Sequence, residues 1–121
     1  MGSIPDTIGM WNRTLKAFLI SGSQFGGTIP SAIGTLTKLL YLDLSENRFN
    51  GTIPPELFDL SLLQVLSLGE NSLFGTVPSA LSNLATVLKV LDLKSSSFTG
   101  VVLPYIVDFN AAYLTAPKAQ S

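Results

Sequence analysis

The sequence predicts an α/β repeat fold, in which the chain winds into a coil of stacked turns with a parallel sheet along one side. The first observation behind this prediction is a pattern that recurs four times, beginning at Leu15, Leu39, Leu63 and Leu88, at intervals of 24, 24 and 25 residues. The second is that leucines, a glycine and, in three copies, a proline keep the same places within each interval. Because no single copy can bury its own leucines, the copies must stack to form a core.

Each copy opens with a short strand. In Leu42-Asp43-Leu44 the alternation sends both leucines to one face and Asp43 to the other. Stacked about 4.8 Å apart, four such segments are predicted to form the parallel sheet: 17–21, 41–45, 65–69 and 90–94. We expect their inward residues to form shared columns in the core: Phe18, Ile20, Leu42, Leu44, Leu66, Leu68, Leu91 and Leu93.

A turn-rich stretch follows each strand. An amide can bond backbone groups that strand pairing leaves unsatisfied, so one polar position per copy is expected to form a structural ladder: Ser23, Asn47, Asn71 and Ser96. An apolar residue comes next and predicts a second column: Phe25, Phe49, Leu73 and Phe98. A glycine then stands where the backbone must bend back or approach a neighbour closely: Gly27, Gly51, Gly75 and Gly100.

A short helical segment is predicted to complete each turn on the opposite side. Pro30, Pro54 and Pro78 are each expected to open such a segment, because proline is tolerated in a first helical turn.

The repeat register also divides the chain. We expect leucine repeats over 1–104, followed by a C-terminal cap or tail at 105–121 that covers the last turn. Within the array the units are a half repeat at 2–14, repeats at 15–38, 39–62 and 63–87, and a degenerate copy at 88–104. The half repeat has no strand of its own, so the chain is expected to begin within a repeat and to be part of a longer protein.

The pattern resembles the plant-type leucine-rich repeat, written LxxLxLxxNxLxGxIPxxLxxLxx, and matching positions run from residue 2 to 104. The resemblance implies a right-handed solenoid with a parallel concave sheet and short helical or 3-10 segments on the convex side. This subclass occurs in receptor kinases, receptor-like proteins and polygalacturonase-inhibiting proteins, so it implies binding of a protein or peptide by the concave strands. Members usually carry paired cysteines in flanking caps, whereas this chain has no cysteine.

Composition excludes several classes of function. Seven Lys and Arg against eight Asp and Glu give a formal charge of −1 without a basic run, so nucleic-acid binding through phosphate neutralisation loses most of its physical basis, and we expect no nucleic-acid partner. The apolar stretch 101–107 is interrupted by a proline and is far shorter than the roughly 20 residues that cross a bilayer. Histidine and cysteine are both absent, so no Ser-His-Asp or Cys-His arrangement can form and the usual zinc ligands are missing. We expect no enzyme activity, no cofactor and no metal site.

The candidate ligand-binding residues are those that the strands turn outward on the concave side: Leu19, Tyr41, Asp43, Ser45, Val65, Ser67, Val90, Asp92 and Lys94. An aromatic side chain beside apolar neighbours suits a protein or peptide contact. Glu46 and Glu70 occupy equivalent places in consecutive repeats, and paired carboxylates about 5 Å apart are typical of retaining glycosidases. Their place at an exposed strand end, with no predicted cleft to raise a pKa, favours a solvated surface instead.

The compartment is left open by the sequence. Asn12-Arg13-Thr14 and Asn50-Gly51-Thr52 are N-glycosylation sequons if the chain is secreted, so Asn12 and Asn50 are glycosylation candidates. An extracellular or plasma-membrane-associated location as part of a longer protein follows from the resemblance. An intracellular location is the alternative, because no signal peptide and no cysteine are present.

The sequence and the resemblance support two candidate functions. The first is a non-catalytic module that recognises a protein or peptide through its concave strands. The alternative is a structural or accessory subunit that docks on another chain, edge to edge, through its uncapped N-terminal repeat.

Overall fold

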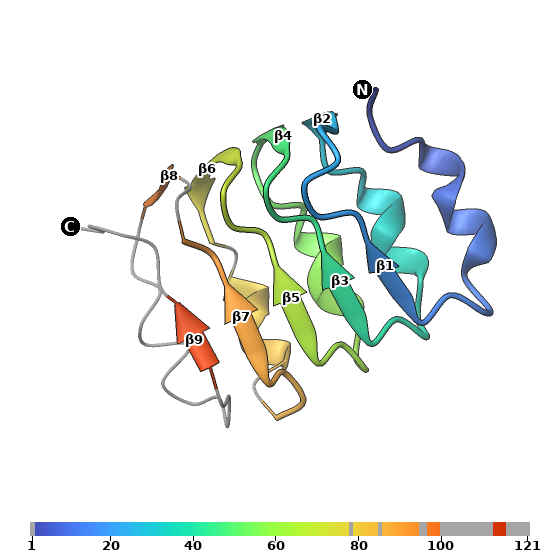
Figure 1. The fold of residues 1–121 in the computed structure, drawn as a ribbon. Helices are drawn as coiled ribbons and strands as arrows, with labels where there is room; N and C mark the ends of the chain where they lie inside the picture. Colours follow the sequence, from blue (N-terminus) through green and yellow to red (C-terminus); the bar gives the residue numbers. More distant parts are fainter. Residues whose placement is uncertain (1, 78, 85, 95–96, 100–112, 116–121) are drawn as a thin grey trace.

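The computed structural model describes residues 2–77, 79–84, 86–94, 97–99 and 113–115. The chain forms a coil whose concave side is one parallel sheet, in the order β1-β3-β5-β7-β9. Figure 1 shows these strands side by side, with the helical segments behind them. The strands are β1 (Ala17–Leu19), β3 (Tyr41–Asp43), β5 (Val65–Ser67), β7 (Val90–Asp92) and β9 (Tyr113–Thr115). The predicted repeat fold is therefore confirmed.

The concave sheet differs from the prediction in two ways. Its strands are three residues long, although pairing continues beyond them, for example through the bond from Leu44 N–H to Ser67 O at 2.8 Å. It also has a fifth strand, β9, which lies inside the segment predicted as a cap or tail and pairs in parallel with β7. The sequence hides this strand because Leu114 matches Leu91 but alanines, Ala111 and Ala116, stand at the positions that match Leu88 and Leu93.

A second parallel sheet lies along the turns, and the sequence analysis did not predict it. Its order is β2-β4-β6-β8. The prediction failed because a glycine with positive φ interrupts three of the four segments, at 73° in Gly27, 81° in Gly51 and 88° in Gly75, so these stretches have the composition of a turn. The strands are β2 (Gly26–Thr28), β4 (Arg48–Gly51), β6 (Ser72–Thr76) and β8 (Ser97–Thr99).

The convex side is built from short 3-10 helices: η1 (Asp6–Trp11), η2 (Ser31–Thr35), η3 (Pro55–Asp59) and η4 (Ser79–Leu84). Pro30 and Pro54 stand one place earlier than predicted, as extended N-cap residues, and the proline in the first turn of η3 is Pro55. Pro78 lies outside the described residues. In the part of the chain that the structure describes, no helix is long and apolar enough to cross a membrane.

The core lies between the concave sheet and the 3-10 helices, and its leucines stack in columns. Phe18, Leu42, Leu66 and Leu91 are neighbours in the strand register, and the last three are fully buried. Leu44, Leu68 and Leu93 are buried beside them. Each such side chain contributes roughly 1.5–3 kcal/mol when it leaves water. Phe25 and Phe49 stack with parallel rings whose centroids are 6.4 Å apart, which extends the second predicted column.

The longer third interval, which leads to the fourth copy, is absorbed on the convex side. In the second and third turns, Leu39 N–H bonds Leu36 O and Leu63 N–H bonds Leu60 O, each across three residues. In the fourth turn Leu88 N–H bonds Leu84 O across four residues, at 2.9 Å. The strand register is unaffected, because Val65 pairs with Val90 as Tyr41 pairs with Val65.

Candidate functional site

The concave face carries an apolar row of side chains that runs across the strands. The strand register aligns Ala17 with Tyr41, Tyr41 with Val65 and Val65 with Val90, and we call these four residues the apolar row. Tyr41 is 41% exposed, Ala17 is also exposed, and the two valines are half-buried. Aromatic and aliphatic surface that is open to solvent can be buried by a partner with a gain of roughly 25 cal/mol per Å².

A second row lies beside the apolar row and changes from apolar to polar along its length. The register aligns Leu19 with Asp43, Asp43 with Ser67 and Ser67 with Asp92. Leu19 is 62% exposed and extends the apolar surface at one end, whereas the other three positions are polar. The predicted concave residues therefore come together on one surface, with an apolar and a partly acidic half. Their role in binding stays a prediction.

Local hydrogen bonds fix the carboxylates of this surface. Asp43 Oδ1 accepts from the Ser45 hydroxyl at 2.6 Å and from the Ser45 N–H at 3.0 Å, and the Ser45 and Ser21 hydroxyl oxygens are 3.1 Å apart. Asp92 Oδ1 accepts from Lys94 N–H at 3.1 Å. Gly69 lies at the place of Ser45, and a Cβ there would come within 2.9 Å of Asp92 Oδ1. The glycine therefore makes room for the neighbouring carboxylate.

The polar position after each strand joins successive turns. Asn47 is buried, and its Oδ1 accepts from the N–H groups of Ser23 and Phe25, while its Nδ2 donates to the carbonyl oxygens of Ile20, Leu44 and Ser45. Asn71 repeats this arrangement one turn later and bonds Phe49 N–H at 3.0 Å and Leu44 O at 2.9 Å. The Ser23 hydroxyl donates only weakly to Ser21 O, at 3.5 Å. Ser96 lies outside the described residues.

Glu46 and Glu70 share an unusual backbone conformation. Their φ angles are 56° and 57°, in the left-handed region that costs an ordinary residue about 1–2 kcal/mol, and Gly22 takes the same place at 69°. Both glutamates are exposed, and Glu46 Oε1 lies 3.8 Å from where a Cβ on Gly22 would be. Within the described ranges no three acidic residues lie close enough to hold a metal ion.

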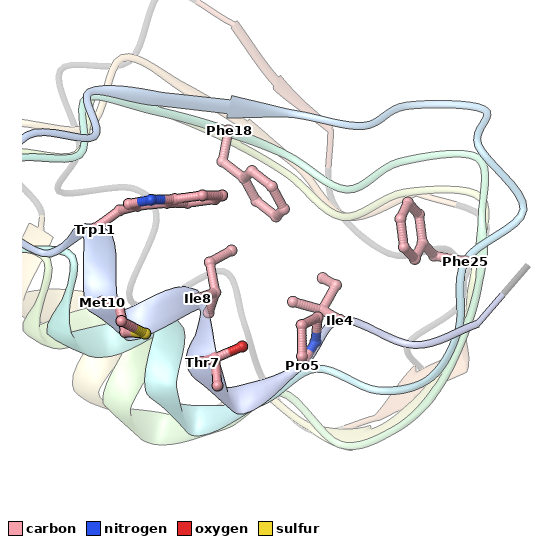
Figure 2. Close-up of a pocket in the computed structure, with 8 residues that line it drawn as sticks. All are labelled: Ile4, Pro5, Thr7, Ile8, Met10, Trp11, Phe18 and Phe25. Atoms are coloured by element: carbon pink, nitrogen blue, oxygen red, sulfur yellow. The ribbon is translucent and has the colours of Figure 1, made fainter.

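A pocket of about 480 Å³ opens at the N-terminal edge of the coil, between η1 and β1. Figure 2 shows Ile4 and Ile8 from the N-terminal segment facing Phe18 across this space, with Trp11 at one end and Phe25 at the other. The lining is Ile4, Pro5, Thr7, Ile8, Met10, Trp11, Phe18 and Phe25, without a charged residue. The repeat register predicts an uncapped edge but not a pocket. The local signal of a pocket is Trp11, the single tryptophan, beside Met10 in a stretch that otherwise follows the repeat.

The two glycosylation candidates are both on the surface. Asn12 is the exposed C-cap of η1, and Asn50 is exposed on β4. Both amides are thus open to solvent, and their use stays a prediction.

Comparisons with known proteins agree with this geometry. The family profile for the Leucine Rich Repeat matches residues 38–60 and 62–84. No curated protein sequence matches the chain. The ectodomain of the receptor kinase SOBIR1 from Arabidopsis thaliana is similar at 34% identity and a TM-score of 0.87, over 95% of this chain and 62% of that one.

Two further solved structures extend the comparison. A plant ice-binding protein is 32% identical with a TM-score of 0.86, over 96% of this chain and 37% of that one. The Arabidopsis receptor kinase HAESA, solved with the peptide hormone IDA and the co-receptor SERK1, is 29% identical with a TM-score of 0.74, over 95% of this chain and 24% of that one. The chain thus spans between about a quarter and three fifths of these proteins.

The buried leucine columns, the amide ladder, the parallel concave sheet and the matching family profile agree with one another. The chain folds as a leucine-rich-repeat solenoid, its residues 38–60 and 62–84 match the Leucine Rich Repeat profile, and its fold resembles the ectodomains of plant receptor kinases.

Proposed function

We propose that the chain is a non-catalytic recognition module that binds an extended polypeptide across its concave strands. The observation that carries this proposal is the apolar row together with Leu19 of the neighbouring row, because Tyr41 and Leu19 are large, exposed side chains on the concave face. Large apolar groups at the centre of a surface are typical anchors for a protein partner. The solved complex of HAESA with a peptide hormone supports the same use of a related fold.

The size and charge of the face limit the ligand. From Ala17 to Val90 the apolar row crosses three strand spacings, about 14 Å, which an extended segment of four or five residues covers at roughly 3.3 Å per residue. Asp43 and Asp92 lie on the neighbouring row, so a ligand with apolar side chains on one edge and a basic group on the other would complement the surface. Because a plant ice-binding protein has a similar fold, the fold alone does not identify the ligand, and the proposal rests on the residues of the concave face.

The experiment uses peptides selected from a random heptapeptide library displayed on phage and panned against the wild-type chain. Tyr41→Glu and Val65→Glu should each weaken binding of the selected peptides at least tenfold, because a charge in the apolar row would have to be desolvated. Phe74→Glu is the matched control, since Phe74 is 52% exposed but lies on β6 in the other sheet. Unchanged affinity in both concave variants, with unchanged circular dichroism, would exclude this face.

The proposed setting is extracellular, as in the receptor ectodomains of similar fold. When the chain is expressed through a plant secretory pathway, a glycan mass at Asn12 or Asn50 is the expected result, because both are exposed sequons. Unmodified asparagines in secreted protein would instead favour the intracellular alternative.

A second candidate function is that of an accessory subunit that docks through its N-terminal edge. The observation that favours it is the uncharged pocket between η1 and β1, with Met10 80% exposed beside it. Exposed apolar surface of this kind marks interaction sites. Binding of a partner at this edge should be lost in Trp11→Glu and kept in Tyr41→Glu. Binding at the concave face should show the opposite pattern.

A further inference from the structure

The outer face of the second sheet carries an exposed aromatic residue that neither candidate function uses. Phe74 lies on β6 and is 52% exposed, whereas Leu73 beside it is buried. Its strand and β4 are the two inner strands of the sheet (Figure 1), so Phe74 lies away from both ends of it. A single exposed apolar side chain needs no explanation by itself. What matters is the residue that the fold places next to it.

That neighbour is Asn50, on β4. The strand register pairs Asn50 with Ser72 of β6, and Phe74 is two residues further along the same strand. Because side chains alternate between the two faces of a strand, Ser72 and Phe74 share the outer face with Asn50, and all three are exposed. With strands about 4.8 Å apart and a rise of about 3.3 Å per residue, the Cα atoms of Asn50 and Phe74 are about 8 Å apart.

Asn50 also begins a sequon, Asn50-Gly51-Thr52. The end of this sequon lies directly against β6, because Cγ2 of Thr52 is 2.9 Å from the place that a Cβ on Gly75 would take. Both Asn50 and Thr52 are exposed. A sugar joined to the Asn50 amide would therefore start next to the part of β6 that carries Phe74.

We propose that a glycan on Asn50 lies across Phe74, with its first N-acetylglucosamine stacked on the aromatic ring. The C–H groups on one face of a sugar ring suit the negative face of a phenyl ring, while the hydroxyl groups at the rim stay in water. The surrounding residues fit a neutral sugar. Ser72 and Thr76 supply hydroxyl groups on the same strand, and Arg48 is the single charged residue of the four strands of this sheet.

The covalent link allows a weak contact to form. A sugar attached to Asn50 is held near Phe74 at an effective concentration of about millimolar or above, so the stack does not depend on free sugar in solution. In the unfolded chain the two residues are 74 − 50 = 24 positions apart, and the repeat must fold to bring them together. A contact that exists only in the folded state stabilises that state.

The inference rests on the proposed extracellular setting, because these glycans are added in the secretory pathway. It does not involve the apolar row, so concave recognition stands or falls separately. A glycan at Asn12 with an unmodified Asn50 would leave the extracellular setting intact and overturn the stacking. Two unmodified asparagines in secreted protein would overturn both.

The experiment uses the full chain, secreted from cells that keep their glycans in the high-mannose form. Asn12→Gln leaves Asn50 as the single sequon, and mass spectrometry reports its occupancy. Endoglycosidase H then trims the glycan to one N-acetylglucosamine. We expect the trimmed protein to melt about 3 °C above the same chain with Asn50→Gln, because the stacked sugar remains. The same two sequences made in bacteria, without glycans, give the baseline, and equal melting temperatures after its subtraction overturn the inference.

Phe74→Ala tests the contact itself. In this variant the gain from the sugar should fall from about 3 °C to under about 1 °C. Tyr41→Ala is the matched control, because Tyr41 is an aromatic residue 41% exposed on the other sheet, and the gain should be unchanged. A gain that survives Phe74→Ala would refute the stacking and leave Phe74 as a surface for another molecule.

Sugar resonances provide a second readout that a general effect of glycosylation would not move. In the trimmed glycoprotein, protons on the stacked face of the sugar should shift upfield, because they lie over the ring of Phe74. The shift should disappear in Phe74→Ala and remain in Tyr41→Ala. Sugar protons that resonate at the same position with and without Phe74 would contradict the proposed contact.

Discussion

Asn47 allows a quantitative test of what joins one turn of the coil to the next. Its amide accepts two backbone N–H bonds from the preceding repeat, at 3.1 Å from Ser23 and 2.9 Å from Phe25. It also donates to three backbone carbonyl oxygens at 2.9–3.1 Å. Asn47→Ala would leave all of these groups without the amide, and we predict that the protein is destabilised by several kcal/mol.

The magnitude follows from the number of groups and their burial. A buried backbone group that loses its partner costs about 1–3 kcal/mol. The two N–H groups have a single acceptor in Asn47 Oδ1, whereas the carbonyl oxygen of Leu44 also accepts from Asn71. Both donors are only partly buried, so we count about 1–2 kcal/mol for each, and little for the carbonyl oxygens, because Leu44 O keeps its bond from Asn71 and Ser45 O its bond from Gly22 N–H; the sum is about 2–4 kcal/mol. A domain of this size has about 5–15 kcal/mol of stability, so the variant should still fold.

The assay is equilibrium unfolding in urea, followed by circular dichroism. Asn50→Ala is the control, because Asn50 is an exposed asparagine in the same turn and should cost less than about 0.5 kcal/mol. In thermal unfolding the Asn47 variant should melt about 10 °C below the wild type. If the two variants proved equally stable, solvent would have replaced the amide, and the ladder would not hold the turns together.

Three further predictions concern packing and backbone conformation. Leu66→Ala should lower the free energy of unfolding by about 2–5 kcal/mol in urea, because Leu66 is fully buried. The control Leu62→Ala, at a residue that is 45% exposed, should cost under about 1 kcal/mol, and equal losses in the two variants would contradict the core described above. Gly34→Ala should cost about 1–3 kcal/mol in the same assay, because the added Cβ would meet the Glu56 carbonyl oxygen. The control Gly2→Ala should be neutral, because a Cβ there has no neighbour within 4 Å. If both variants were neutral, η2 and η3 would be free to separate. Glu46→Gly should raise the free energy of unfolding by up to about 1 kcal/mol, and with it the melting temperature, because it relieves a φ of 56°. A lower melting temperature than that of Glu46→Ala would refute this reasoning.

Much of the fold could be predicted because the leucine period reports directly on burial. Leu42, Leu66 and Leu91 recur at the intervals that place them in adjacent strands, and the structure buries all three. Residue type was less informative where backbone pairing determined the structure. The segments of the second sheet contain turn residues such as Asn50 and Gly51, and they are strands only because the neighbouring turns supply hydrogen-bond partners.

The candidate site was only partly accessible to sequence reasoning. Strand alternation placed Tyr41 and Val65 on the outer face, and their alignment in one row follows from the constant interval. The left-handed conformation of Glu46 and Glu70 could have been inferred from Gly22 in the same register, but a single glycine in a glycine-rich turn is a weak signal. The pocket could not be predicted, because its volume depends on the distance between η1 and β1, which no local pattern encodes.

The wider turn between Leu84 and Leu88 shows where this architecture tolerates changes in length. One added residue enlarges a loop of the convex surface, while the concave residues on either side keep their alignment across the strands. Insertions there are thus mechanically separated from the concave face. A fluorophore attachment site or short affinity tag could be introduced after Thr86 without disturbing the alignment of the concave residues, and duplicated or lengthened turns could accumulate in relatives while that face is retained.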